Sequence, residues 1–314
     1  MLLRRYCAII YGVYLYRRCK LKKLRCIMAL CAFISALMLS GCGQTSDNQF
    51  NLIVSKPWGD SVIEERMEYA YTMTRSDGTV AASGIYTVTV SVSDGKTRFK
   101  SSLDISYSDG GSASMQSLVI MDSSSLYPEY SEKTLENRTE GGEGYSLIMD
   151  YENLTSSMKF SSKDAPEEQI ALSEPGLEVY DNEQLYQIVR AADNLTAKDN
   201  SGTFTIINGV DSYLYGEETR YSMLYVVGDA LSVKAEGMAN KYGVNADGNI
   251  PCRSVSIKIN SDRSGPGTVI DYAAEKFEGG GRNVPVRITR SQYSTSSFDI
   301  EFTHTYVLKD YRTR

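Results

Sequence analysis

Histidine and cysteine are nearly absent from most of this 314-residue sequence. His304 is the only histidine, and five of the six cysteines fall within residues 1–42, which leaves Cys252 alone in residues 43–314. A histidine–cysteine zinc site and an internal disulfide both need more such residues, so the counts exclude them there. We expect no metal site and no cofactor, and a buried apolar role for Cys252, with a reactive or intermolecular thiol as the alternative.

Basic residues are also scarce after residue 42. Residues 1–42 hold eight Lys and Arg and no acidic residue, which leaves 25 basic against 39 acidic residues, a net charge of −14, in residues 43–314. Nucleic-acid binding requires a basic surface against the phosphates. A body this acidic is therefore not expected to bind nucleic acid.

The sequence lacks the motifs of common hydrolases. A Ser-His-Asp triad would have to use His304, and no Gly-x-Ser-x-Gly motif accompanies it. His304 alternates in phase with Phe302 and Tyr306, which predicts an inward-facing, hydrogen-bonded histidine. Two carboxylates alone can hydrolyse glycosides, but no pair stands out among the 39 acidic residues. We therefore predict that the protein is not an enzyme.

An export sequence stands near the N-terminus. Lys20 to Arg25 are mostly basic, residues 26–39 form an apolar run too short to favour a membrane span, and Leu39-Ser40-Gly41-Cys42 follows. This tetrapeptide resembles the lipobox of bacterial lipoproteins. The resemblance implies cleavage between Gly41 and Cys42 and a diacylglycerol on the Cys42 thiol. An ordinary cleaved signal peptide and an uncleaved anchor are the alternatives.

The sequence divides into three parts. We assign residues 1–41 to a lipoprotein signal peptide, 42–56 to the lipidated cysteine and a tether, and 57–314 to a single β-rich domain. Residues 1–20 precede a complete signal, so we hypothesise that they are a misassigned extension and that translation begins at Leu21; a genuine two-part N-terminus is the alternative. One acyl chain binds membranes only marginally, so stable anchoring needs the two chains of a diacylglyceryl group. We expect the protein at the extracytoplasmic face of the cell membrane, anchored through Cys42.

Long antiparallel strands are predicted in the body. Ser-Asp-Gly occurs at residues 76–78, 93–95 and 108–110, and Asp-Gly readily adopts the positive φ that hairpin turns need. The spacings leave strands of roughly 12–14 residues, far longer than the usual five or six. Apolar and polar residues alternate between these turns and again near residues 255–259, 284–288 and 298–302. Weaker strand patterns lie at 111–122, 126–135, 144–151, 156–161, 203–208, 212–227, 231–236 and 268–277. The fold class is mainly β, a twisted antiparallel sheet or half-barrel.

One covering helix is predicted at about residues 181–193. Asp181-Asn182-Glu183-Gln184 has the form of a capping box, with Asp181 as the N-cap. Apolar residues then recur at helical spacing: Leu185, Ile188, Val189 and Ala192. A single amphipathic helix among many strands is expected to cover an open face or mouth of the sheet.

This order of elements resembles a family of uncharacterised bacterial envelope proteins. The resemblance lies in the long hairpins, in the Asp-initiated helix with Leu185-Tyr186-Gln187-Ile188-Val189-Arg190, and in the closing Val284-Pro285-Val286-Arg287-Ile288. That family is related in fold to the periplasmic carrier and outer-membrane receptor proteins of lipoprotein sorting, which are half-barrels closed by a helix that hold acyl chains on a concave face. The resemblance covers about residues 60–307 and implies a fold and a ligand class, but no catalytic residue.

The leading hypothesis is a non-enzymatic surface lipoprotein that binds a hydrophobic or lipid-like ligand on the concave face of a half-barrel. Candidate ligand-binding residues are His304, Phe302, Tyr306 and Trp58. For Trp58 the favoured interpretation is a plug under the end of the sheet, and a ligand-binding aromatic is the alternative. The alternative is a structural or protein-interaction module of the cell envelope with a fully packed sheet and no small-molecule ligand. The expected partners are the membrane, through Cys42, and a hydrophobic ligand or an envelope protein.

Overall fold

The structure is a computed structural model that describes residues 57–58, 63–162, 167–174, 179–261, 267–278, 280–293 and 300–314. These residues belong to one compact unit, Phe50–Arg314. Its main hydrophobic core consists of its own side chains, between Trp58 and Tyr311. A unit that contains its own core is expected to fold independently. Residues 1–56, with Gly41 and Cys42, lie outside the described residues, so the signal, lipidation and tether stay predictions.

The first eight strands form a meander of hairpins. The strands are β1 (Glu64–Arg75), β2 (Val80–Ser93), β3 (Lys96–Tyr107), β4 (Ser112–Asp122), β5 (Pro128–Asn137), β6 (Tyr145–Asp150), β7 (Thr155–Phe160) and β8 (Glu168–Ala171). Each Ser-Asp-Gly triplet lies in a turn between two of them, and Gly78, Gly95 and Gly110 have φ of +85°, +72° and +92°. Strands β2 and β3 have 14 and 12 residues. The predicted turns and strand lengths are confirmed.

The second half of the chain holds the remaining strands and the helices. They are β9 (Val179–Asp181), η1 (Asn182–Gln184), α2 (Leu185–Ala191), β10 (Ser201–Ile207), α3 (Gly209–Tyr215), β11 (Arg220–Lys234), η2 (Glu236–Met238), β12 (Asn249–Ile259), β13 (Thr268–Ala273), β14 (Pro285–Tyr293) and β15 (Ile300–Thr313). The helices are short, so strands dominate the described part of the chain.

All fifteen strands belong to one sheet, whose order is β8-β7-β6-β5-β4-β3-β2-β1-β15-β14-β13-β12-β11-β10-β9. The pairing of β1 with β15 joins the two halves of the chain, and the two edges of the sheet are β8 and β9. Every pairing is antiparallel except that of β9 with β10. The predicted class, a mainly β antiparallel half-barrel with a covering helix, is confirmed.

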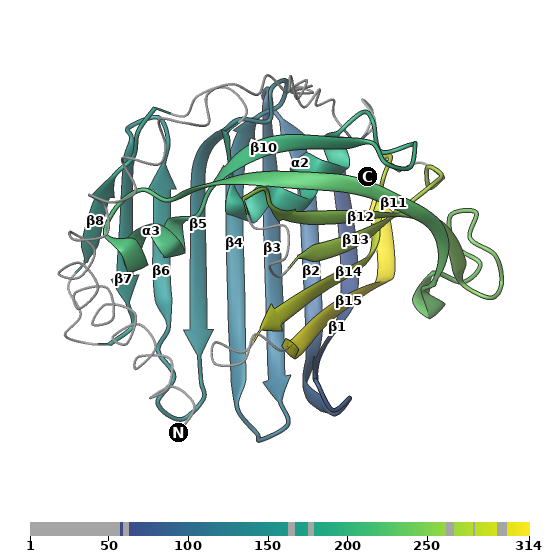
Figure 1. Ribbon diagram of the computed structural model, residues 1–314, viewed down its shortest axis with the longest axis horizontal. Coiled ribbons are helices and arrows are strands. Elements are labelled where there is room, and N and C mark those ends of the chain that lie inside the picture. The colour runs from purple at the N-terminus through teal and green to yellow at the C-terminus, as the bar shows by residue number, and fades with distance from the viewer. Residues whose placement is uncertain are drawn as a thin grey trace, which may run out of the picture. The chain divides into compact units, whose positions relative to one another are not determined.

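The sheet curls over itself, and its inner surface is called the concave face below. Figure 1 shows β10–β13 crossing in front of the upper parts of the long strands β2–β5, with α2 enclosed between the two layers. Register shifts accompany this curl, for example between Glu68 and Tyr69 and between Val227 and Ala230. Such bulges bend a strand and increase its twist, which lets a long sheet fold back on itself.

Two predictions about the helices need correction. The expected helix at 181–193 is a 3₁₀ turn followed by α2, and it ends at Ala191. The expected strand at 212–227 is wrong over its first residues, because α3 covers Gly209–Tyr215 and β11 begins at Arg220. The Asn208 side chain accepts a hydrogen bond from the N–H of Asp211 (3.2 Å), and Gly216 ends the helix at φ +74°. These two caps outweigh the β-propensity of the residues between them.

Candidate functional site

The start of α2 is fixed by the side chain of Asp181. Its Oδ1 accepts a hydrogen bond from the N–H of Glu183 (2.7 Å), and its own N–H donates to Gln184 Oε1 (3.2 Å), which confirms the predicted capping box. Its Oδ2 accepts hydrogen bonds from the hydroxyls of Ser131 and Tyr151 at 2.5 and 2.6 Å. Burial raises the pKa of Asp181, and the neighbouring Glu183 adds to the rise. The cap therefore ties the helix to the concave face of β5.

The end of α2 is fixed by a buried ion pair. Arg190 binds both oxygens of Glu65 on β1, with Nη1–Oε2 at 2.5 Å and Nη2–Oε1 at 2.9 Å, and neither side chain is exposed. The Tyr311 hydroxyl donates to Glu65 Oε1 at 2.5 Å, and Arg190 Nε donates to the carbonyl of Arg282 at 2.9 Å. Burial raises the pKa of Glu65, but Arg190 and the hydrogen bonds from Tyr311 and the N–H of Gly281 outweigh it and hold the pKa below its ordinary value. The pair clamps the helix against β1 and β15.

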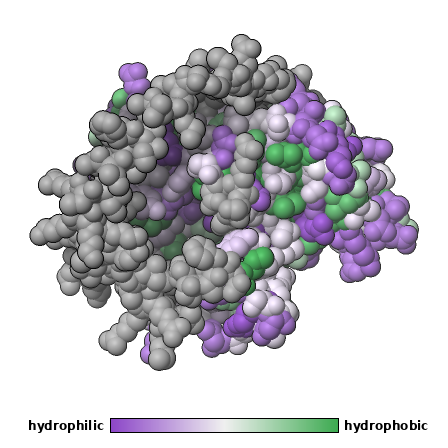
Figure 2. Space-filling model, in the orientation of Figure 1, coloured by the Kyte–Doolittle hydropathy of each residue, from purple (hydrophilic) through white to green (hydrophobic). Residues whose placement is uncertain are grey.

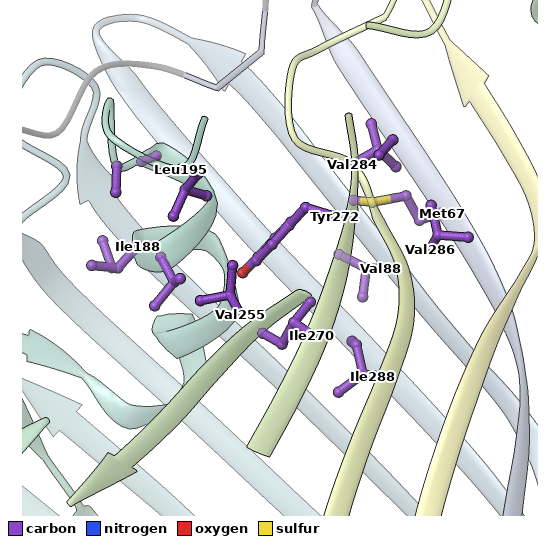
Figure 3. Close-up of a cluster of buried hydrophobic side chains, with 14 of the residues drawn as sticks. Met67, Val88, Ile188, Leu195, Val255, Ile270, Tyr272, Val284, Val286 and Ile288 are labelled. Atoms are coloured by element: carbon purple, nitrogen blue, oxygen red, sulfur yellow. The ribbon is translucent and has the colours of Figure 1, made fainter. Parts of the chain in front are cut away.

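The concave face around α2 is filled by the chain's own side chains. Figure 3 shows Tyr272 projecting between the helix, which carries Ile188, and the strand that carries Val255. The Tyr272 hydroxyl donates to the carbonyl of Tyr186 on α2 at 3.0 Å. Ile188, Val255 and Ile270 are almost fully buried. This part of the half-barrel therefore resembles an ordinary packed core.

A second part of the concave face is only partly covered. It lies on β1–β4 and β15 and is called the tyrosine cluster; its buried members are Tyr71, Ala82 and Leu103, and its half-buried members are Met73, Tyr86, Ile105, Tyr107, Met115 and Tyr306. Figure 2, in the orientation of Figure 1, shows a hollow in which both hydrophobic and hydrophilic described residues are visible. Four tyrosines and two methionines on one surface offer flat and adaptable apolar contacts with hydroxyls at their edges.

The aromatic rings of the tyrosine cluster contact one another across three strands. The ring centroids of Tyr71 and Tyr306 are 5.0 Å apart, and those of Tyr86 and Tyr306 are 5.2 Å apart in an edge-on arrangement. Tyr86 also lies 5.7 Å from Tyr69 of the main core. Tyr306 thus joins β15 to β1 and β2 over the surface that is left half-buried.

His304 lies beside this cluster with both ring nitrogens engaged. Nδ1 lies 2.9 Å from the Tyr71 hydroxyl, and Nε2 lies 3.1 Å from Gln292 Oε1. An amide oxygen only accepts, so Nε2 carries the proton and Nδ1 accepts from Tyr71. Burial lowers the pKa of His304, and the positive charge of Arg290 lowers it further. The one basic nitrogen of neutral His304 is therefore occupied by the Tyr71 hydroxyl.

The structure brings together some of the candidate residues predicted from the sequence. His304, Tyr306 and Phe302 occupy the same face of β15, and all three are half-buried. Trp58 is 3% exposed and belongs to the main hydrophobic core. Trp58 therefore lies in the main hydrophobic core and is not a member of the tyrosine cluster.

Sequence reasoning missed several residues of this surface. Tyr71, Met73 and Met115 lie in strands whose alternation was not used to choose site residues. Arg290 was not predicted as a site residue, because an arginine in an alternating strand is normally assigned to the solvent side. The only usable pattern was its even spacing from Val286 and Ile288, which face inward.

A separate groove lies at the ends of β5, β6 and β7. Its volume is about 480 Å³, and Leu135, Tyr145 and Phe160 form its apolar side. These three residues are cross-strand neighbours. Polar side chains complete the lining: Thr134, Glu136, Asn137, Arg138, Ser146, Lys159, Ser161 and Ser162. The groove is more polar than the tyrosine cluster and opens at the rim of the sheet.

Neither a metal site nor a spanning helix is found in the described part of the chain. No three His, Cys, Asp or Glu side chains are grouped there so that they would hold a metal ion. Cys252 is buried with a free thiol, and burial raises its pKa to about 12. Within the described ranges, no helix is both long enough and apolar enough to cross a membrane.

No protein-family model and no curated protein matches the chain. Solved structures of low similarity do match. A β-barrel-like protein from Brucella abortus with the domain of unknown function DUF1849 is 10% identical and covers 81% of this chain and 98% of its own, with a TM-score of 0.49. A candidate lipoprotein from Parabacteroides distasonis (10% identity, 78% and 94% coverage, TM-score 0.24) and a DUF1329 protein from Desulfovibrio piger (10%, 81% and 87%, TM-score 0.22) also match. These TM-scores lie below 0.5, too low to transfer a function.

Proposed function

We propose that this chain is a membrane-anchored, extracytoplasmic lipoprotein without enzymatic activity, whose half-barrel binds a hydrophobic or lipid-like ligand on its concave face. The tyrosine cluster is the observation that carries the proposal. It is a continuous apolar surface on the inside of the sheet, yet six of its nine residues are only half-buried. An apolar surface left open inside a curved sheet is typical of a ligand-binding surface.

An alkyl chain suits the chemistry of this surface. Buried methylenes contribute about 0.8 kcal/mol each, so roughly eight of them laid across the cluster would contribute about 6 kcal/mol before the entropy cost of binding. Methionine side chains adapt to a flexible chain, and the tyrosine rings present flat apolar faces. His304 adds little to this role except to orient Tyr71, because its own nitrogens already have partners.

Binding can be tested with the chain from Gly43 onward, which contains the whole compact unit. We expect native mass spectrometry to detect co-purified or added dodecyl amphiphiles on the wild-type protein. Ile105→Gln places a polar group within the tyrosine cluster and should weaken binding at least several-fold. The matched control is Ile85→Gln, because Ile85 is 37% exposed and lies out of phase with the buried face of β2. Absence of binding to the wild-type protein, or equal effects of both variants, would contradict the proposal.

The anchor requires a separate test on the full chain. The support for it is the sequence Leu39-Ser40-Gly41-Cys42 after a basic and then an apolar segment. We expect the full chain in bacterial cells to fractionate with membranes and to incorporate labelled palmitate. Cys42→Ser should abolish the label. Unchanged labelling of the variant would refute lipidation at Cys42.

The alternative, a structural or interaction module of the envelope, is supported by the packed half of the concave face. There, most of the apolar side chains of α2 and of β10–β14 that face inward are buried in the main hydrophobic core. If the tyrosine cluster takes no ligand while the protein captures a defined envelope partner, this alternative is correct. The Ile105→Gln and Ile85→Gln pair separates the two, because an interaction through the outer surface should respond to the second variant rather than the first.

A further inference from the structure

Arg290 places a positive charge beside the tyrosine cluster. It lies on β14 between Thr268 of β13 and His304 of β15, its register partners. It is in phase with Val286 and Ile288, which are buried in the concave face, and yet Arg290 itself is exposed. The concave face is therefore open to solvent at this position.

The charge of Arg290 reaches several groups of this surface. It lowers the pKa of His304 after the larger effect of burial, and it opposes the burial that raises the pKa of Tyr186 and Tyr306. These groups come from α2 and β15, so the charge of Arg290 acts on both of these elements. Among the described residues, no carboxylate forms an ion pair with Arg290. By contrast Arg287, three residues earlier and out of phase, pairs with Asp271 at 2.6 Å.

We propose that Arg290 binds the anionic head group of an amphiphile whose alkyl chain lies on the tyrosine cluster. This inference rests on the proposed function and narrows its ligand class to alkyl chains that end in a carboxylate or a phosphate. A guanidinium presents a planar set of donors that matches both groups in bidentate fashion. In a body of net charge −14, an exposed arginine on an inner surface supplies local attraction for an anion that the outer surface repels.

The position of Tyr306 supports this arrangement. Its ring belongs to the tyrosine cluster and contacts Tyr71 and Tyr86, and it lies two residues along β15 from His304, the register partner of Arg290. One residue thus links the apolar surface to the cationic group. A ligand that reaches both must be amphipathic, with its charged end toward β14 and its chain over β1–β4.

The test compares ligands with one chain and different heads on the chain from Gly43 onward. Dodecanoate, dodecyl phosphate and dodecanol are titrated by calorimetry below their critical micelle concentrations, with inorganic phosphate as the head group alone. We expect Arg290→Gln to weaken dodecanoate and dodecyl phosphate by roughly 10- to 100-fold, the range for a charge-assisted hydrogen bond, and to change dodecanol less than about twofold. Arg290→Lys should retain part of the affinity. Arg312→Gln, an exposed arginine on β15 that pairs with Asp310, is the control and should change nothing.

Each outcome decides between the two proposals. If the wild-type protein binds none of the dodecyl ligands, the proposed function and this inference both fail. If it binds all three with equal affinity and Arg290→Gln changes none, the ligand surface stands and the head-group site is refuted. A uniform loss across all three ligands shows a structural role for Arg290 and also refutes the site. If one anionic amphiphile binds more tightly than the other, its head group is the one that the site prefers. If inorganic phosphate alone binds with the same affinity as dodecyl phosphate, the alkyl chain contributes nothing and the proposal of an amphiphilic ligand is refuted.

An NMR titration of the single histidine supplies a second readout. A bound anion near Arg290 should raise the pKa of His304 relative to the free protein, whereas dodecanol should not. Arg290→Gln should raise the pKa of His304 in the free protein and abolish the further rise with dodecanoate. An equal shift with dodecanol and dodecanoate would refute a charged head group at this place.

Discussion

The buried pair of Glu65 and Arg190 predicts a large, pH-dependent loss of stability when Arg190 is replaced. Arg190→Met keeps most of the apolar volume and leaves the Glu65 carboxylate buried without its cation. Breaking one side of a buried ion pair typically costs about 3–5 kcal/mol. For a chain of this size, 1 kcal/mol corresponds to about 2–4 °C in melting temperature, so Tm should fall by roughly 6–20 °C.

The pH dependence follows from the direction of the pKa of Glu65. In the wild type this pKa lies below its ordinary value of 4.5, so the pair stabilises the fold above about pH 4.5 and loses this contribution as the pH falls. In Arg190→Met, burial remains without the cation, so the pKa of Glu65 should rise above the unfolded value. The variant then gains stability relative to the wild type as the pH falls. The difference between the two proteins should be largest near pH 7 and smallest near pH 4.

Urea unfolding at pH 7 and pH 4 measures both effects. The double variant Glu65→Leu/Arg190→Met leaves neither charge buried and should be more stable than Arg190→Met alone at pH 7. Arg138→Met is the control, because its pair with Glu136 is 72% and 58% exposed and should contribute less than about 1 kcal/mol. An Arg190→Met penalty that is equal at both pH values, or a double variant that loses the sum of the single losses, would refute the reasoning.

Three further predictions concern single positions. Gly84→Ala should lower the free energy of unfolding by about 1–3 kcal/mol, because the added Cβ would lie 1.9 Å from the carbonyl oxygen of Asp104. Gly228→Ala, whose Cβ would have its nearest atom at 3.5 Å, should lower it by less than about 0.5 kcal/mol. Equal melting temperatures of the two variants would contradict this prediction. NMR titration should give His304 a pKa below 6.5, so its contribution to stability is lost as the pH falls below that value; a pKa of 6.5 or higher would be inconsistent with its burial. Cys252, whose pKa is raised to about 12, should resist a thiol reagent in the native protein and react fully in denaturant, and fast native labelling would show that it is accessible.

Local patterns explain why much of the fold was predictable. Each Asp-Gly turn, the alternation along β2 and β3, and the capping box at Asp181 depend on residues within a few positions of one another. Such features are encoded by backbone sterics and short hydrogen bonds, which do not depend on the rest of the chain. The helix α3 was missed because its caps, Asn208 and Gly216, enclose residues that favour strands.

Long-range features were not accessible in the same way. Glu65 and Arg190 are 125 positions apart, and nothing near either residue marks it as buried. The pairing of β1 with β15 requires the two ends of the domain to meet. Only this pairing brings Arg290 on β14 close to the residues of β1 and β2. The sequence was enough to predict that His304 and Tyr306 lie on the inward face of β15. It was not enough to predict which residues of β1, β2 and β14 contact them.

The length of the covering helix determines where the open surface lies. A helix of seven residues spans about 10 Å, whereas the 14 residues of β2 extend over roughly 46 Å. The helix is fixed at one end by Asp181 to β5 and at the other by Arg190 to β1, so it lies across several strands and covers one level of the sheet. Near the ends of β1 and β3, the apolar side chains of Met73, Ile105 and Tyr107 stay half-buried. The tyrosine cluster is therefore a consequence of long strands closed by a short, clamped helix, and its position beside Arg290 follows from the pairing of β14 with β15, which places Arg290 opposite His304.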